Sequence, residues 1–534
     1  MSTTPNTDAR TDDGAGESLG IAGSISRAFI NSPLTPLLLI AALILGFVAL
    51  LMLPREEEPQ ISVPMVDVFI QANGLAADDA VELVAKPIEA LLQRLPGVEH
   101  VYSQSFDDRI MATARFEVGV PEDDAILRVH CEIRANFDQL PIGIPEPLII
   151  GRGVNDVAIL VLSLAPRADL PRDEAERWDR ANLGEVASQL MSELSKAEDV
   201  GRTYIVGDSR TEIRVEPDTA ALALYGVTLE QLAEKVRNAN RSELLGRVRQ
   251  TGASRDLLSG QSLVGQPDLG LLLVTTRDGR PVYVKDVARV SIAPADADNR
   301  AWTLHPGEAT PRPAVSLAFA KREGANAVNV AKELLQRLEI AERDFLPDAL
   351  EVEVTRNYGE TAQKKSDELF SHLAGASVSI FLMIVVFIGW REGVVTLIII
   401  PATILMTFAA SYLMGFTINR VSLFALIFSI GILVDDAIVV VENIARHWRL
   451  DPNGDKTKVA LRGVAEVGNP TIIATLTIVF ALLPMLFVSG MMGPYMSPIP
   501  TNASAAMILS FFVAVIFAPW IMLRLQRRKP GAVA

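Results

Sequence analysis

The stretch FSIGILVDDAIVVVEN, residues Phe428 to Asn443, places two adjacent aspartates, Asp435 and Asp436, inside a run of apolar residues. At the centre of a membrane helix each carboxylate costs roughly 2.5–3.5 kcal/mol on insertion scales. Successive helical residues differ by about 100° in direction, so both side chains can face the interior of a helix bundle. Two neighbouring carboxylates in a low dielectric cannot both stay ionised without a counter-charge. We therefore predict that Asp435 and Asp436 form a proton relay, with a static polar pair as the alternative.

The residues around this pair are predicted to have structural roles. Gly431 lies one turn before Asp435 and is predicted to let another helix approach closely. Glu442 and Asn443 follow the pair and are interpreted as a solvated, locally capped helix end.

The pair needs a positive partner, which the sequence does not supply. The interiors of the predicted spans contain no Lys or Arg, and the nearest cations, such as Arg391 and Arg420, lie at span ends, where they are interpreted as interfacial anchors. The counter-charge is therefore expected from another polypeptide or from a second half of the protein.

Five further apolar stretches reach the length of about 20 residues that a bilayer requires. The predicted spans are Leu34–Leu53, Leu369–Trp390, Val394–Met414, Val421–Val441, Thr471–Ser489 and Ala503–Leu523. They divide the chain into a disordered tail (1–33), a first transmembrane helix (34–54), a large external region (55–368), transmembrane helices two to six (369–523) and a basic tail (524–534).

The short loops predict the orientation in the membrane, because cytoplasmic loops are rich in Lys and Arg. Basic residues gather after the fourth span and at the C-terminus: Arg446, Arg449, Lys456, Lys458, Arg462, Arg524, Arg527, Arg528 and Lys529. Both regions are expected in the cytoplasm, and an even number of spans then places the N-terminus there too. The region 55–368, which opens with Glu56, Glu57 and Glu58, is expected on the outer side.

The external region has the pattern of a repeated α/β unit. Residues 66–118 alternate as strand, helix, strand and strand, and a helix follows over 121–139, which predicts a split βαβ, ferredoxin-like sandwich. The same order recurs in the strand 157–164, the helix 173–196, the strands 200–206 and 211–215, and the helix 228–240. Residues 244–276 are predicted to be an insertion, and the segments 313–320, 327–340 and 351–355 to complete the second unit. The predicted fold class is an α+β membrane protein: a six-helix transmembrane bundle with repeated ferredoxin-like subdomains outside it.

Composition narrows the possible functions. The net charge of −15 argues against a nucleic-acid binder. The Met-rich segment Met485–Met496 is interpreted as an apolar loop rather than a metal site, because no His or Cys accompanies it. The sequence has no Gly-rich phosphate loop followed by Lys and Ser or Thr, so ATP is not expected as the energy source. We expect neither a metal nor a bound cofactor.

Several motifs resemble one known family, the resistance–nodulation–division (RND) efflux permeases. GILVDDAIVVVENIAR (Gly431–Arg446) resembles the fourth-helix motif of that family, and NGLAADDAVELVAKPIEALLQRLPGVEHVYSQS (Asn73–Ser105) resembles the start of its first porter subdomain. Further segments resemble the later porter segments and the third and fifth helices: GRPVYVKDVARV (Gly279–Val290), REGANAVNVAKEL (Arg322–Leu334), IPATILMTF (Ile400–Phe408) and TLTIVFALLPMLFVSGMMG (Thr475–Gly493). The VDDA form resembles the drug and hydrophobe-amphiphile branch.

The resemblance implies a function and partners. It implies a secondary transporter rather than an enzyme: an inner-membrane permease of a multidrug or amphiphile efflux pump, which exchanges substrate for protons by alternating access and is driven by the proton-motive force. Asp435 and Asp436 correspond to the paired relay aspartates of the family. A homotrimer, a periplasmic adaptor and an outer-membrane channel are implied as partners. Substrate-binding residues cannot be carried over to this chain.

Members of the family are about twice as long, built from two six-helix repeats, and this chain resembles the N-terminal half. A C-terminal half, in cis or in trans, is therefore expected to complete the transporter. One alternative is a half-subunit that supports assembly without transporting. Another is a protein-export subunit of the SecD/SecF type, against which the duplicated external region and the VDDAIVVVEN motif argue.

Overall fold

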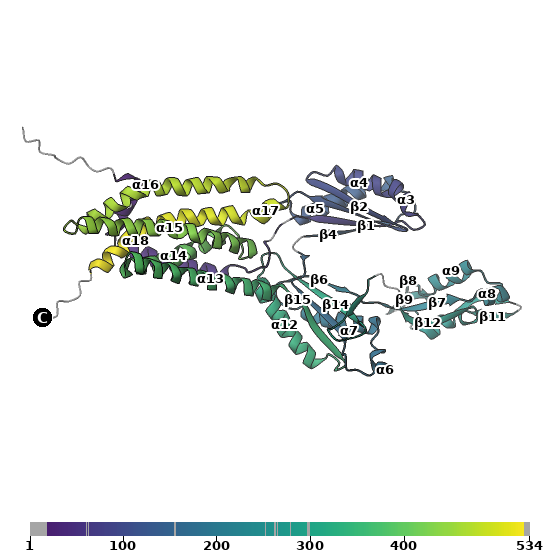
Figure 1. Cartoon of the computed structure of the whole chain (residues 1–534). Coiled ribbons are helices and arrows are strands. Elements are labelled where there is room, and N and C mark those ends of the chain that lie inside the picture. The colour runs from purple at the N-terminus through teal and green to yellow at the C-terminus, as the bar shows by residue number, and fades with distance from the viewer. Residues whose placement is uncertain are drawn as a thin grey trace, which may run out of the picture.

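The computed structural model describes residues 19–527, except residues 60, 62, 154–155, 251–252, 261–262, 264, 278 and 296–298. It consists of a bundle of long helices and three α/β lobes that lie beyond one end of the bundle (Figure 1). The predictions for residues 1–18 and 528–534 lie outside the described residues.

Six helices of the described chain are long and apolar enough to cross a membrane. They are α2 (Leu34–Met52), α13 (Tyr358–Phe387), α14 (Trp390–Leu413), α15 (Arg420–Leu450), α16 (Lys456–Leu482) and α18 (Pro498–Arg527). The prediction of six such helices is confirmed. Several run past their apolar cores because polar caps decide where a helix begins: Asn357, Asn419 and Asp455 each accept backbone N–H donors at the start of α13, α15 and α16.

The prediction of a disordered tail is wrong for the residues just before the first span. Helix α1 (Gly20–Phe29) packs against α16 and α18, with Ala22 and Ile30 almost completely buried. The reason is close packing of small residues: a Cβ added to Gly468 of α16 would lie 2.1 Å from the Cβ of Ala22. Composition alone suggested a polar tail, but this segment has an apolar face for the bundle to cover.

Burial is uneven across the bundle. In α18, 72% of the most apolar window is buried, whereas in α16 none of it is. Helix α18 is therefore the centre of this bundle, and it contacts α14, α15 and α16. The apolar surface of α16 faces outward, as a helix in lipid does.

The first external lobe is a four-stranded antiparallel sheet covered by helices. Its strands follow the order β2-β3-β1-β4, with β1 (Met65–Gln71) paired to both β3 (Arg109–Phe116) and β4 (Leu148–Arg152). The remaining elements are β2 (Val98–Phe106), the helical run α3 (Ala77–Ala80), η1 (Val81–Ala85) and α4 (Lys86–Gln93), and the helix α5 (Glu122–Ala135), which the 3-10 turn η2 (Phe137–Gln139) follows. Each long helical connection returns the chain across one inserted strand, as the split βαβ pattern requires.

The second lobe repeats this arrangement with strands that are far apart in the sequence. Strand β14 (Arg312–Lys321) lies between β5 (Leu160–Pro166) and β6 (Val200–Val206), and β15 (Leu350–Asn357) pairs with the other side of β5. Helices α7 (Arg180–Leu194) and α12 (Ala327–Asp344) pack on the sheet. The short helix α6 (Arg172–Ala175) and strand β13 (Ala301–Thr303) belong to the connections.

The third lobe is an insertion between β6 and β14, and it is larger than predicted. Strand β7 (Thr211–Pro217) pairs with β12 (Ala288–Pro294), and helices α8 (Thr219–Tyr225) and α9 (Leu229–Ala239) belong to the same lobe. The assignment of 211–215 and 228–240 to the second sandwich was therefore wrong: these segments begin the insertion. The lobe also contains the hairpin β8 (Ser242–Gln250) and β9 (Ala253–Gly260), the pair β10 (Leu273–Arg277) and β11 (Arg280–Tyr283), and the helices α10 (Gln266–Gly270) and α11 (Val284–Val287).

Candidate functional site

Helix α15 carries the predicted proton-relay residues, and its start is firmly fixed. The side chain of Asn419 accepts from the N–H groups of Val421 and Ser422, and the Ser422 hydroxyl accepts from the N–H of Asn419. This capping box is buried, with Asn419 1% exposed. From it α15 runs through the bundle between α14, α16 and α18, so its sides meet different surroundings.

The structure gives the two aspartates different surroundings. Asp436 is partly buried, between Leu433 and Ala437 of its own helix, and the hydroxyl of Ser510 on α18 is its polar neighbour. Asp435 is exposed on the outer side of α15. The two carboxylates thus point to different sides of the helix, as their 100° separation requires.

Ser510 already has a hydrogen-bond acceptor. Its side chain is 1% exposed and its Oγ donates to the carbonyl oxygen of Leu433 at 2.6 Å. A hydroxyl has one hydrogen and two lone pairs. In this arrangement the Ser510 oxygen is free to accept a hydrogen bond, and a protonated Asp436 can donate one.

The exposed side of α15 forms a continuous stripe with Asp435. One helical face carries the exposed side chains of Phe424, Ile427 and Phe428, followed by Gly431 and Asp435. A Cβ added to Gly431 would meet no atom of the described residues within 4 Å. No helix of the described chain packs against Gly431, because this stripe of α15 is exposed. The predicted helix contact at Gly431 is therefore absent within the described chain.

The nearby cations have other partners. Among the ion pairs of the described residues none involves Asp435 or Asp436. Arg420, at the start of α15, pairs with Glu58 at 2.6 Å, and the Arg391 guanidinium lies 5.6 Å from the ring centre of Trp390. These contacts fit the interpretation of both arginines as residues at helix ends.

The interpretation of Asn443 as a solvated cap is wrong. Helix α15 continues to Leu450, and Asn443 is 7% exposed and donates to the Gly463 carbonyl of α16 at 2.7 Å. Its amide also donates to Glu466 at 3.3 Å. Glu442 is exposed, as expected.

Sequence reasoning missed the polar cluster that continues this contact. Glu466 of α16 accepts from Arg446 at 2.9 Å and lies 3.1 Å from the His447 ring nitrogen Nε2. The one available signal was the spacing of Asn443 and His447, which places both on one helical face. Their partner is on another helix, which the spacing cannot identify.

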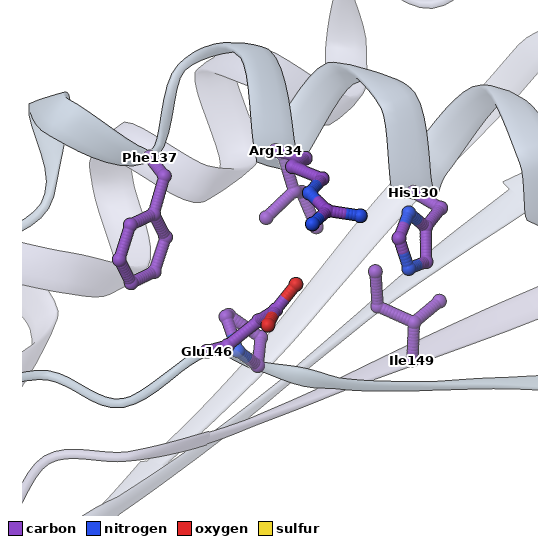
Figure 2. A pocket seen from close by; sticks show the side chains of 7 residues that line it. His130, Arg134, Phe137, Glu146 and Ile149 are labelled. Carbon is purple, nitrogen blue, oxygen red and sulfur yellow. The ribbon is translucent and has the colours of Figure 1, made fainter.

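A separate pocket lies in the first external lobe, between α5 and the chain that leads to β4 (Figure 2). Its volume is about 190 Å³, and His130, Arg134 and Phe137 line one wall, with Glu146 and Ile149 on the other. Figure 2 shows the Arg134 and Glu146 side chains directed toward one another across it. Within the described part of the chain, no group of three or more His, Cys, Asp or Glu is placed to hold a metal ion.

Comparison with known proteins identifies the family. The model of the AcrB/AcrD/AcrF family matches residues 25–531. The chain belongs to this family. The resemblance to RND permeases read from the motifs is therefore confirmed.

Related curated proteins agree with this assignment. The chain is 30% identical over 499 residues to a multidrug resistance protein MdtC of Pantoea ananatis, an alignment that covers 92% of this chain and 46% of that protein. It is 28% identical to the MdtC protein of Edwardsiella ictaluri (93% and 47% covered) and 30% identical to that of Salmonella paratyphi C (94% and 48% covered). The chain thus spans about half the length of these relatives, which fits the predicted N-terminal half.

Proposed function

We propose that this chain is the N-terminal half of a multidrug efflux permease in the bacterial inner membrane, and that it exchanges amphiphilic substrates for protons. The observation that carries the proposal is the Asp435–Asp436 pair inside an apolar helix of an AcrB/AcrD/AcrF family member. A carboxylate within a membrane helix is a functional site by default, because its insertion is costly.

Proton movement is assigned to two carboxylates with separate tasks. Asp436 takes up a proton and, when protonated, donates to the oxygen of Ser510, whose own hydrogen is directed to the Leu433 carbonyl. Asp435 faces a cation that lies outside the described chain, against the stripe around Gly431. When Asp435 is ionised it attracts that cation, and when it is protonated it releases it, so the proton changes how the two halves pack. Alternating access follows from this change. The proton-motive force drives it, and no cofactor is involved.

The external lobes are assigned to substrate handling and assembly. The first two are proposed to be ferredoxin-like porter subdomains, since both have the same strand order. The third presents the hairpin β8–β9, whose apolar side chains are exposed: Leu244, Leu245, Val248, Leu257 and Leu258. A two-stranded hairpin is marginally stable alone. Contact with another copy in a homotrimer would cover it, and a periplasmic adaptor and an outer-membrane channel would complete the pump.

The proposed orientation places the external lobes in the periplasm. Helix α1 and the C-terminal part of α18 lie at the opposite end of the bundle (Figure 1). The polar cluster with Arg446, His447 and Glu466 lies at that end as well. The excess of basic residues in the loops and tail there supports a cytoplasmic location.

The test is dye efflux in cells that lack their own pumps, with the chain expressed alone and together with a C-terminal half. We expect efflux only with both halves, sensitive to a protonophore, and a loss of at least about 100-fold in Asp435→Asn or Asp436→Asn, since a relay group without a titratable proton cannot work. Glu442→Gln, an exposed carboxylate on the same helix, is the matched control.

Two outcomes would contradict the proposal. If both halves assemble and efflux is indifferent to either Asn variant, the relay assignment is wrong. If the assembled halves transport nothing, a non-transporting assembly role replaces it.

A further inference from the structure

The segment Pro54–Glu58, between α2 and the external lobes, is bonded to the loop that starts α15. The N–H of Glu56 donates to the carbonyl of Ile418, and the N–H of Ile418 donates to the carbonyl of Pro54, both at 2.9 Å. The N–H of Arg420 donates to Glu57 at 3.1 Å. These bonds make a short parallel bridge, so this segment cannot slide along the loop without breaking it.

The opposite edge and the side chains of the same segment are bonded to the second lobe and to the start of α13. The N–H of Ala327, the first residue of α12, donates to the Arg55 carbonyl at 3.0 Å. The Arg55 guanidinium donates to Gln363 of α13, also at 3.0 Å. The Nζ of Lys321, the last residue of β14, donates to the Glu56 carboxylate at 3.2 Å.

The Glu56–Lys321 ion pair differs from the other ion pair at this place in its burial. The Glu56 side chain is 3% exposed and that of Lys321 10%, whereas Glu58 and Arg420, which also pair here, are 59% and 52% exposed. A buried ion that loses its partner has no water to replace it, while an exposed pair loses little. Burial raises the pKa of Glu56, and the Lys321 ammonium partly offsets that effect. The Glu56–Lys321 contact is therefore the buried ion pair that, together with the Ala327–Arg55 backbone bond, holds this segment to the second lobe.

We propose that Glu56 and Lys321 are positioning residues that couple α15 to the second sandwich. The coupling of proton uptake to substrate movement that this serves rests on the proposed function. Asp436 lies 16 residues beyond Arg420, a distance of about 24 Å along a helix. A tilt or shift of α15 on protonation moves the loop at Ile418, and the bridge at Pro54–Glu58 carries this movement to β14 and α12.

The first experiment is hydrogen exchange of the full chain in lipid nanodiscs. In Lys321→Met we expect exchange at the bridging amides of Glu56, Ile418 and Ala327 to rise about tenfold, because the segment loses its buried anchor. Exchange in the core of β5 is expected to stay unchanged, as is exchange at all these amides in the control Glu58→Gln. Unchanged exchange in Lys321→Met overturns the proposal.

The second experiment measures proton uptake and dye efflux separately, in liposomes that contain the chain with a C-terminal half. We expect Lys321→Met to keep proton uptake within about twofold while efflux falls at least about tenfold, and the reversed pair Glu56→Lys with Lys321→Glu to restore part of the efflux. Equal losses of uptake and efflux, or no loss of efflux, overturn the coupling. If the parent itself shows no proton-coupled efflux, the proposed function fails instead.

A double variant tests the proposal if Lys321→Met does not fold. If Lys321→Met does not accumulate, Glu56→Met with Lys321→Met replaces the pair by apolar side chains, a change that buried ion pairs often tolerate. This double variant is expected to fold, with its efflux lowered as above. Parent-like efflux in it overturns the proposal.

Discussion

At the residue scale, the sequence singled out Asp435 and Asp436 as a predicted proton relay but did not show how their surroundings differ. The VDDA motif does not distinguish Asp435 from Asp436. In the structure Asp435 is exposed, whereas Asp436 is partly buried beside Ser510. Ser510 lies on α18, and no local pattern links it to α15. The same limit applies to Asn443 and Glu466, whose contact depends on how two helices cross.

A pH-dependent contribution to stability is expected at Glu122, at the start of α5. Burial raises the pKa of this carboxyl above its ordinary value of 4.5, Asp156, Asp123 and Glu323 raise it further, and Arg202 offsets part of the effect. The folded protein therefore favours the protonated form. This contribution to stability is present below pH 4.5 and is lost as the pH rises through the folded-state pKa.

Glu122→Gln removes the titrating group, and with it the loss of stability at higher pH. We expect its thermal unfolding midpoint to exceed that of the parent at pH 7 by at most about 2–4 °C, because the group is only partly buried. The difference should shrink toward pH 4.5. Glu117→Gln, an exposed carboxylate of the same lobe, should show no such trend. A lower midpoint for Glu122→Gln at pH 7 contradicts the prediction.

At the element scale, single side chains decide how the long helices meet. The sequence predicted the helices because apolar runs of this length are unmistakable, but it gave neither their polar extensions nor their neighbours. Asn443 on α15 and Gly46 on α2 are two positions where the helix contact is specific.

Asn443→Ala is expected to weaken the contact between α15 and α16. The substitution removes the 2.7 Å hydrogen bond to the Gly463 carbonyl, which still accepts within α16, at a cost of about 0.5–1.5 kcal/mol. Denaturation of the chain in mixed micelles measures this free energy. The neighbouring Glu442→Ala removes an exposed side chain and should stay within about 0.5 kcal/mol of the parent. Equal effects of the two substitutions would refute the assignment of Asn443 to the helix contact.

Two glycines are expected to differ in their tolerance of a methyl group. At Gly46 a Cβ would lie 2.5 Å from the backbone of Leu405 on α14, so Gly46→Ala should destabilise the chain by about 1–3 kcal/mol. At Gly431 a Cβ meets nothing within 4 Å in the part of the chain that the structure describes, so Gly431→Ala should not destabilise the isolated chain but should weaken its association with a C-terminal half. Unfolding of the chain and co-purification of the two halves measure the two effects. If Gly431→Ala lowers the stability of the isolated chain and leaves co-purification of the two halves unchanged, this stripe is not an interface.

At the scale of the whole molecule, the predicted architecture agrees with the structure in its six helices and in the order of elements in the first lobe. The assignment of β7 and α9 failed for a physical reason. A strand followed by a helix has the same local pattern in either sheet, and only the partner strand, β12, shows where β7 belongs. Long-range pairing of this kind leaves no periodicity in a short window.

The position of β14 between β5 and β6 also determines when the second sheet can form during synthesis. Strands β5 and β6 each pair with β14 in the described chain, and β14 is separated from β6 by residues 207–311. At a synthesis rate of about 5–20 residues per second, roughly 5–20 s pass between the synthesis of β6 and that of β14. The second sheet lacks this strand until then. During this interval the inner edges of β5 and β6 have unpaired N–H and C=O groups, which makes them sites for proteases, chaperones and mispairing. The insertion therefore lengthens the period in which a newly made chain is vulnerable.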